Sequence, residues 1–346
     1  MESKAVYHHL IPQTYMRGWK HNKSSIYLVE KGTKSIGSEK STERFGGIEH
    51  YHSLRAGSLS RTKEDCERFF EPLKDYKVKL DNDLINDTLE MNNRFYEFDV
   101  WSIYRPNGDL ITKAEKKDLK NKILSIHIRD IEGDWNTKYE NYWNSIVTDI
   151  SKKVYENPGV EKFIAIRRDD LIKFMVSLEW RTKPYHPVLS GILDAFCNSV
   201  FDFKSIHIPE DERLYPFLET WYDEMAHSYI LKLFRDFLDG KGPIMLEAKK
   251  IINELCTELF LAPDGFEFLT SDNPVCRFTN DDGATEYIFP LTPKIACRIS
   301  KGDNQNDYIL RELSKEELFY YNNKLKDNCY KAYILSEQNL ELYFDN

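Results

Sequence analysis

Residues 266–299 read FEFLTSDNPVCRFTNDDGATEYIFPLTPKIACRI, and this stretch decides the fold class. It contains four short apolar runs that are separated by turn-forming residues, notably the stretch NDDG at 280–283. Short runs rich in β-branched and aromatic residues, bounded by Gly, Pro, Asn and Asp, are typical of β-strands. Because sequential strands joined by short turns pair antiparallel, we expect a small antiparallel sheet or meander here.

The middle of the chain has a different period. Between residues 61 and 260, apolar residues recur every three or four positions, which is the pattern of amphipathic helices. The segments with the clearest helical period are 136–157, 169–181 and 211–238. Residues 244–260 are ambiguous, because their apolar spacing suits a helix while the first few residues suit a strand.

Strands are also predicted near both ends of the chain, at 25–29, at 332–335 and at 342–344. Since both ends carry strands and the middle is helical, we expect the ends to join in one small mixed or antiparallel sheet. The sequence therefore predicts an α+β fold and one large domain. Its expected parts are an N-terminal mixed unit (1–60), a helical region (61–260) and a C-terminal sheet unit (261–346).

The composition limits the possible cellular location and binding partners of the protein. Of its 346 residues, 41% are hydrophobic and 14% aromatic, so a substantial core is feasible. Lys and Arg number 48 and Asp and Glu 57, and the net charge of 48 − 57 = −9 gives no general attraction to nucleic acid or anionic lipid. The N-terminal segment has no apolar signal region, and no stretch approaches roughly eighteen uncharged apolar residues. We therefore expect a cytoplasmic protein without a membrane partner.

Several catalytic and metal-binding motifs are absent. The six cysteines form no C-x-x-C pair, so metal knuckles and redox motifs are not indicated, and we expect reduced, structural thiols. The phosphate loop of nucleotide hydrolases, the G-x-G-x-x-G fingerprint, the G-x-S-x-G elbow and H-E-x-x-H are missing too. These absences argue against the commonest nucleotide, dinucleotide, serine-hydrolase and zinc-protease classes.

Two adjacent histidines stand in the stretch YHHLIPQTY, residues 7–15. Adjacent side chains of a strand or helix point in different directions, so His8 and His9 are not expected to face one metal ion together. One imidazole is a candidate ligand, general base or donor to phosphate, while the other packs. The structural alternative is that both are ordinary packed or exposed residues.

A second candidate lies where a predicted strand ends, in LTSDNPV, residues 269–275. Strand ends deliver polar side chains into loops that a rigid sheet holds, which is a common place for catalytic carboxylates. Asp272 and Asn273 are the candidates. The alternative is a structural role, because Ser and Asn-Pro are ordinary turn formers. Asp272 would then cap the turn.

A third candidate is Arg181 in WRTKPYHP, residues 180–187, at the end of a predicted helix. An arginine beside two prolines suits a rigid anion clamp. A cation at a helix C-terminus is also favoured by the helix dipole, and that alternative needs no function.

The stretch EHYH at residues 49–52 is a fourth candidate. On a strand, His50 and His52 would share one face, where the pair could bind a metal ion. A solvated edge is the structural alternative.

The motifs at both ends of the chain resemble one family. The residues His-His-x-x-Pro-Gln-x-Tyr at 8–15, Ser-Asp-Asn-Pro at 271–274 and Phe-Pro-Leu-Thr-Pro at 289–293 are similar to domain-of-unknown-function family 4238 (DUF4238), and the resemblance spans most of the chain. Arg181 and Thr182 fit a recurrent position of that family. No established activity comes with the resemblance, but it implies that these polar residues converge. The bacterial, variable contexts of such proteins imply a role in conflict with phage or mobile elements.

We therefore expect an enzyme: a hydrolase that acts on phosphoesters, in the form of a metal-assisted nuclease of bacterial defence or mobile-element conflict. Its partner would be a nucleic acid or nucleotide, and its cofactor a divalent metal held by His9 and Asp272. The expected catalytic residues are His8, His9, Arg181, Asp272 and Asn273.

The competing expectation is a non-enzymatic sensing or binding module. The same motifs would then form a structural hydrogen-bond network between the N-terminal unit and the C-terminal sheet. Because a buried polar group left unpaired costs roughly 1–3 kcal/mol, mutations in the motifs would then destabilise the fold.

Overall fold

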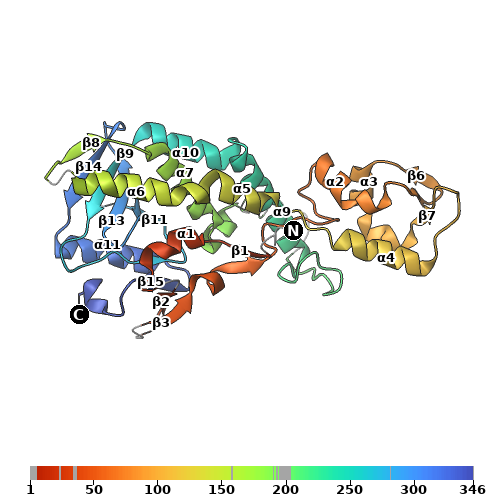
Figure 1. The fold of residues 1–346 in the computed structure, drawn as a ribbon, viewed down its shortest axis with the longest axis horizontal. Helices are drawn as coiled ribbons and strands as arrows, with labels where there is room; N and C mark the ends of the chain where they lie inside the picture. Colours follow the sequence, from red (N-terminus) through yellow and green to blue (C-terminus); the bar gives the residue numbers. More distant parts are fainter. Residues whose placement is uncertain are drawn as a thin grey trace. The chain divides into compact units, whose positions relative to one another are not determined.

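The computed structural model describes residues 6–22, 25–33, 37–156, 159–189, 191, 194, 204–280 and 282–345. These residues form two compact units, and the chain passes between them several times (Figure 1). Unit 1 consists of the described residues of Met1–Val6, His50–Gly133 and Ser190–Arg235, and unit 2 of those of Tyr7–Glu49, Asp134–Leu189 and Asp236–Asn346. The helical region expected over 61–260 is thus divided between both units.

Unit 1 combines helices with a three-stranded antiparallel sheet. Its sheet has the order β6-β5-β7, formed by β5 (Lys77–Leu80), β6 (Asp83–Ile85) and β7 (Ser102–Tyr104). Its helices include α2 (Lys63–Phe69), η3 (Glu71–Leu73), α3 (Thr88–Asn93), η4 (Phe95–Val100), α4 (Lys113–Leu124) and most of α5 (Asp130–Trp135) and α9 (Trp221–Leu238). Capping boxes begin both α2 and α4, which explains where these two helices start.

Unit 2 contains a six-stranded mixed sheet in the order β11-β12-β13-β9-β14-β8. Its strands are β8 (Lys162–Ile164), β9 (Leu255–Leu261), β11 (Cys276–Thr279), β12 (Thr285–Pro290), β13 (Ile295–Lys301) and β14 (Asp307–Glu312). Strands β14 and β9 pair parallel, and the other pairs are antiparallel. The predicted meander is confirmed for three of its four runs, which form β11, β12 and β13 within a larger sheet than expected. The first run, 266–270, lies outside it, because only its last residue belongs to a strand, β10 (Thr270–Ser271), which pairs in another sheet.

A second sheet of unit 2 joins the two ends of the chain. It has the order β10-β15-β2-β3, formed by β2 (Ser25–Glu30), β3 (Ser38–Ser41), β10 (Thr270–Ser271) and β15 (Ala332–Leu335). All its pairs are antiparallel, and Leu28 lies opposite Ile334. The α+β class and the joining of the ends are therefore confirmed. A further two-stranded ladder pairs β1 (Tyr7–His9) with β4 (Gly47–Glu49).

Helices and sheets of unit 2 form layers. Its helical elements are α1 (Gln13–Met16), η1 (Arg17–Trp19), η2 (Thr42–Arg44), the π-helix η5 (Asn136–Glu140), α6 (Asn141–Glu156), α7 (Arg168–Arg181), η6 (Lys183–Tyr185), α10 (Gly242–Glu254), α11 (Lys315–Asn328) and η7 (Leu340–Leu342). Successive strand residues face opposite sides of a sheet. Accordingly, Phe289 of β12 packs on Trp143 of α6, while the adjacent Ile288 joins the core around α11.

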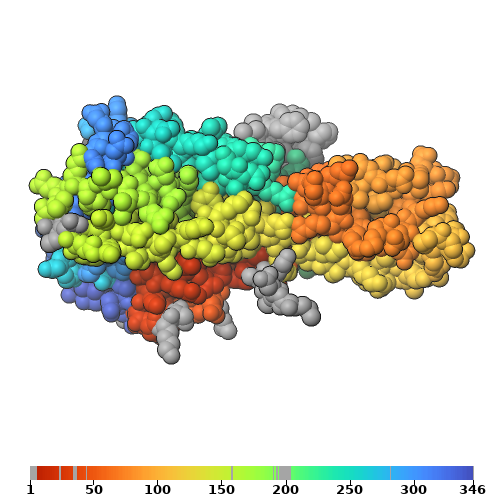
Figure 2. Space-filling view, turned by 45° about the horizontal axis from the view of Figure 1, so that its top comes forward, coloured from red at the N-terminus to blue at the C-terminus, as the bar shows by residue number. Residues whose placement is uncertain are grey.

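Helices α6, α7 and α10 thus lie on one side of the six-stranded sheet, and α11 packs between this sheet and the four-stranded one (Figure 1). On the face seen in Figure 2, yellow-green residues of the α6–α7 region adjoin cyan residues of the α10 region. The described helices include none with the length and apolarity that crossing a bilayer would require.

Two predicted helical segments differ from the structure. In 211–238 the helix begins only at Trp221, because Pro216 lacks the N–H that a helix interior needs. In 244–260 the order is the reverse of the one considered: the first residues belong to the helix α10, with Pro243 in its first turn, and the strand β9 follows. The strand β9 has buried residues on both faces, because helices cover both sides of its sheet.

The buried Asn322 of α11 provides a test of how α11 packs in unit 2. Its side chain donates to the carbonyl oxygens of Glu267 and Tyr343 and accepts from the N–H of Leu269. The substitution Asn322→Leu should lower the free energy of unfolding by roughly 2–5 kcal/mol, because three backbone groups lose their partner. Urea unfolding measures the effect. The same change at the exposed neighbour Asn323 is the control, and equal effects at both positions would contradict the assignment.

Candidate functional site

The two predicted histidines occupy β1. The side chain of His8 is fully buried, and its residue lies opposite Ile48 in the ladder with β4. The half-buried His9 places its ring Nε2 3.3 Å from the carbonyl oxygen of Glu43 and 3.5 Å from the amide nitrogen of Gln13. The two imidazoles therefore lie on opposite sides of a short strand, as the alternation predicts.

Arg181, the last residue of α7, is a buried structural cation. One guanidinium nitrogen lies 2.8 Å from Glu140 Oε1, and another donates to the carbonyl oxygen of His9 at 2.7 Å. The guanidinium carbon lies 4.7 Å from the centre of the Trp135 ring, and the residue is 1% exposed. Its charge is therefore neutralised inside unit 2 by Glu140, which is the last residue of the π-helix η5.

The next residue, Thr182, connects this group to Asn273. Its Oγ1 lies 2.8 Å from the carbonyl oxygen of Glu179 and 2.9 Å from Asn273 Oδ1. The side-chain amide of Asn273 in turn donates to the backbone carbonyl oxygen of Asn328. The side-chain amide of Asn328 donates back to the backbone carbonyl oxygen of Asn273. The structure thus brings His9, Arg181 and Asn273 into one hydrogen-bonded network.

Asp272 directs its carboxylate elsewhere. Its two oxygens accept the backbone N–H groups of Tyr330, Lys331 and Ala332, at 2.7, 2.6 and 3.2 Å. Burial raises the pKa of Asp272, and these three N–H donors oppose that shift. The carboxylate therefore holds the turn between α11 and β15, whereas the predicted metal site would need its lone pairs.

Tyr15 connects the other segments that carry the family motifs. Its buried hydroxyl lies 2.6 Å from Thr270 Oγ1 and donates to the carbonyl oxygen of Pro290 at 2.9 Å. Trp19 adds a hydrogen bond from its ring N–H to the carbonyl oxygen of Phe268. Segments from residues 7–19, 266–274 and 289–293 therefore converge, mostly through backbone groups.

A residue that the sequence interpretation missed lies beside this network. Glu179 of α7 is 1% exposed, and the hydroxyl of Tyr185 donates to its Oε1. Its other oxygen, Oε2, is buried and has no hydrogen-bond partner within the described parts of the chain. A buried carboxyl with an unsatisfied oxygen is costly in free energy, which makes it a candidate for a functional role.

Polar groups from three other elements surround Glu179. Burial raises the pKa of its carboxyl to about 7, and the charge of Glu247 on α10 acts in the same direction. Hydrogen bonding by Tyr185 and the positive charge of Arg277 on β11 oppose the shift. Arg277 is exposed and Tyr185 half-buried, so the buried carboxyl lies close to the surface. At neutral pH, such a carboxyl both gives up and takes up a proton.

The sequence contains a signal for Glu179. The apolar face of α7 includes Leu171, Phe174, Met175 and Leu178. Position 179 lies four residues after Met175 and eight after Leu171, which places a carboxylate on the apolar stripe. A charged residue at an apolar helical position therefore indicates a buried ionisable group.

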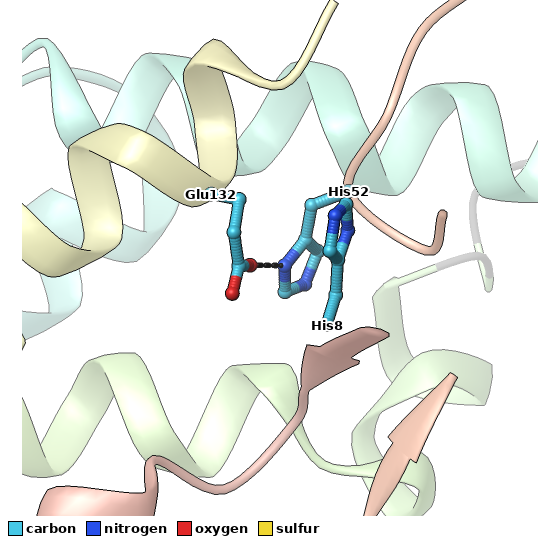
Figure 3. Close-up of side chains that lie close together, drawn as sticks. All are labelled: His8, His52 and Glu132. Atoms are coloured by element: carbon cyan, nitrogen blue, oxygen red, sulfur yellow. Dashed lines mark hydrogen bonds and ion pairs between the residues drawn. The ribbon is translucent and has the colours of Figure 1, made fainter. Parts of the chain in front are cut away.

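His50 and His52 do not form the pair expected for a strand. Residues 50–52 form a turn in which His50 has a positive φ of 58°. His52 Nδ1 lies 2.5 Å from Glu132 Oε2, as Figure 3 shows. Two ligands of one tetrahedral metal ion lie roughly 3.3 Å apart, given bonds of about 2.0–2.1 Å. At 2.5 Å, these two atoms are joined by a hydrogen bond and are too close to each other to be two such ligands.

Two cavities of unit 2 lie away from the predicted residues. One of about 250 Å³ is lined partly by Lys138, Arg167 and Lys173, and another of about 550 Å³ partly by Arg168 and Asn253. Neither is lined by Glu179 or by the residues predicted from the motifs.

The contacts of Asp272 predict a stability effect. The substitution Asp272→Ala leaves three backbone N–H groups without their acceptor, so we expect the free energy of unfolding to fall by roughly 2 kcal/mol or more. Chemical unfolding of the variant is compared with that of Asp264→Ala, which removes an exposed carboxylate. Unchanged stability of Asp272→Ala would contradict a structural role.

Replacing Glu179 with Gln predicts a change in pH dependence. The pKa of Glu179 is raised from 4.5 to about 7 on folding, so the folded state holds the proton more tightly than the unfolded state does. This contribution to stability is complete below pH 4.5 and is lost as the pH rises through 7. Relative to Glu179→Gln, the wild type should therefore lose about 3 kcal/mol across that window.

Urea unfolding of both proteins at a series of pH values measures this difference. Glu254→Gln, which removes an exposed carboxylate of α10, is the control and should follow the wild type. A constant difference between wild type and Glu179→Gln from acid to neutral pH would show that the carboxyl titrates normally.

Comparison with known protein families gives a match over most of the chain. The model of the family described as "Protein of unknown function (DUF4238)" matches residues 7–339. Neither the curated proteins nor the solved structures include a match to this chain. The matched range contains His8, His9, Arg181, Asp272 and Asn273, as well as Glu179. With nearly its whole length covered, the chain belongs to the DUF4238 family.

Proposed function

We propose that this protein is a hydrolase that acts on phosphoesters and that Glu179 is its proton-transferring group. The observation that carries the proposal is the buried Glu179 carboxyl, whose pKa burial raises to about 7 and whose Oε2 has no hydrogen-bond partner among the described residues. A general base is most effective when its pKa lies near the working pH. Burial gives Glu179 this property, whereas Asp272 is engaged by backbone donors.

The surroundings of Glu179 support an anionic substrate. Arg277 is exposed, acts on the same carboxyl through its charge, and lies with its guanidinium carbon 5.5 Å from the Tyr287 ring centre. Arginine presents a planar fork of donors that matches phosphate oxygens. In this proposal Arg277 binds the phosphoryl oxygens, Glu179 accepts a proton from the attacking water, and Tyr185 orients the Glu179 carboxyl.

The more specific proposals concern the metal ion, the substrate and the biological role. Metal assistance through His9 and Asp272 stays a prediction, and so does nuclease activity in bacterial defence or mobile-element conflict. We also propose a cytoplasmic location, which the five described cysteines support because all of them are free and buried.

Turnover by purified protein tests the proposal. The panel consists of p-nitrophenyl phosphate, bis(p-nitrophenyl) phosphate, nucleotides, RNA and single- and double-stranded DNA, each with Mg²⁺, with Mn²⁺ and with EDTA. On any substrate that is turned over, Glu179→Gln should lower kcat by about a hundredfold to ten-thousandfold. As the base form is the active one, kcat/KM of the wild type should rise as the pH passes through 7.

Glu224→Gln is the matched control. Burial also raises the pKa of Glu224 to about 7, but this residue belongs to α9 in the other unit. Its substitution should leave kcat unchanged. Turnover that survives in Glu179→Gln, or falls equally in both variants, would contradict the assigned role.

A second candidate function is a sensing or binding module, and a specific observation favours it. The family residues Arg181, Asp272 and Asn273 are all engaged in hydrogen bonds that hold segments of unit 2 together. Loss of stability in Asp272→Ala combined with no wild-type turnover on the panel would favour this function over hydrolysis.

A further inference from the structure

A cluster of cationic and polar side chains in unit 1 has no part in the proposed hydrolysis. It is built on an isolated antiparallel bridge between Leu54 and Ile128, whose N–H and carbonyl groups exchange two hydrogen bonds of 2.9 and 2.8 Å. Both residues are 1% exposed. Side chains alternate along extended chain, so the neighbours Arg55, His127 and Arg129 lie on the opposite side from this buried pair.

Two histidine rings are stacked at the bridge. The rings of His50 and His127 have centres 4.1 Å apart and planes inclined by 18°. His127 Nδ1 lies 3.3 Å from the hydroxyl oxygen of the buried Tyr215. His50 has a left-handed backbone with φ of 58°, a conformation in which His is enriched together with Asn and Asp, and its ring Nδ1 lies 3.3 Å from the hydroxyl oxygen of Ser53.

Arg55 lies beside Tyr215 and has a side-chain N–H without an acceptor among the described residues. Its guanidinium carbon lies 5.9 Å from the Tyr215 ring centre, and one terminal nitrogen donates to the carbonyl oxygen of Leu214 at 2.7 Å. Its Nε is buried and makes no hydrogen bond to a described residue. A buried N–H without an acceptor is unfavourable unless a ligand or water supplies one.

The electrostatic environment of the cluster is positive. Burial is the largest of the causes that lower the pKa of His127 to about 4, and the neighbouring His50 is the second. Arg55 and Arg129 also act on His127 in that direction, and both lower the pKa of Tyr215 against the rise that burial causes. The charged groups that shift these pKa values include the guanidinium groups of Arg55 and Arg129, and cations of this kind favour the binding of an anion.

We propose that the cluster of His50, Arg55, His127, Arg129 and Tyr215 is a binding site for a phosphoryl group. Two guanidinium groups, two imidazoles and a hydroxyl supply donors from three separate segments of unit 1. That number and spread of donors suits a tetrahedral anion with several oxygens better than a planar carboxylate. The site lies entirely in unit 1, and the inference is independent of the role of Glu179.

Calorimetric titration of the full chain with inorganic phosphate tests the site, with sodium chloride at matched ionic strength in the reference. We expect saturable binding in the millimolar range or below. Two variants keep the local geometry: His50→Asn, since Asn tolerates the left-handed backbone, and His127→Phe, which keeps a stacked ring. Each should weaken phosphate binding by about tenfold, because each removes a ring donor to the anion.

His21→Phe is the matched control, because His21 also stacks on an aromatic ring, that of Tyr27 at 4.0 Å, but in unit 2. It should bind phosphate as the wild type does. The melting temperature with and without phosphate is a second readout: phosphate should raise it in the wild type and in His21→Phe, and less in the two cluster variants.

Three results would overturn the inference. One is the absence of saturable phosphate binding to the wild type. Another is binding that is retained in both His50→Asn and His127→Phe. The third is equal affinity for acetate, which would show that the donors accept any small anion and are not matched to a phosphoryl group.

Discussion

A guanidinium that is 1% exposed must be neutralised and hydrogen bonded where it stands, and this requirement fixes the end of α7. The two terminal nitrogens of Arg181 meet it through Glu140 and the His9 carbonyl oxygen, and the guanidinium lies on the face of Trp135, while its buried Nε makes no hydrogen bond to a described residue. The same helix end carries Glu179 and leads into Thr182. The buried pair of Arg181 and Glu140 therefore positions both the motif network and the ionisable carboxyl, and the rest of the site depends on it.

The polar motifs of the DUF4238 family acquire a physical reason from this arrangement. Tyr15, Asp272 and Asn273 mostly bind backbone groups of distant segments, at 2.6–3.2 Å. Every residue offers the same backbone donors and acceptors, so the residues that supply these groups can vary in type. The polar residue that binds them must keep its own side chain. A pattern of shared polar residues can thus arise from folding alone, and chemistry is better sought in Glu179, whose Oε2 the fold leaves unsatisfied.

Local sequence predicted much of the fold and little of the site. Periodicity identified α6 and α7, the turn residues identified the β11–β13 meander, and two of the three strands predicted near the ends do pair. The role of Asp272 depends on N–H groups about sixty positions away, which no local pattern reveals. His50 and His52 do not share a strand face, because residues 50–52 form a turn in which His50 adopts a positive φ. Only Glu179 left a readable signal, as a carboxylate on an apolar helical stripe.

The titration of Glu179 tests the central claim most directly. Carbon-13 NMR of the side-chain carboxyl, assigned with the Glu179→Gln variant, reports its protonation in the folded protein. Our account predicts an apparent pKa of about 7, raised by burial from 4.5. A midpoint close to 4.5 would show a solvated carboxylate with no special readiness to exchange protons at neutral pH, and would contradict the account.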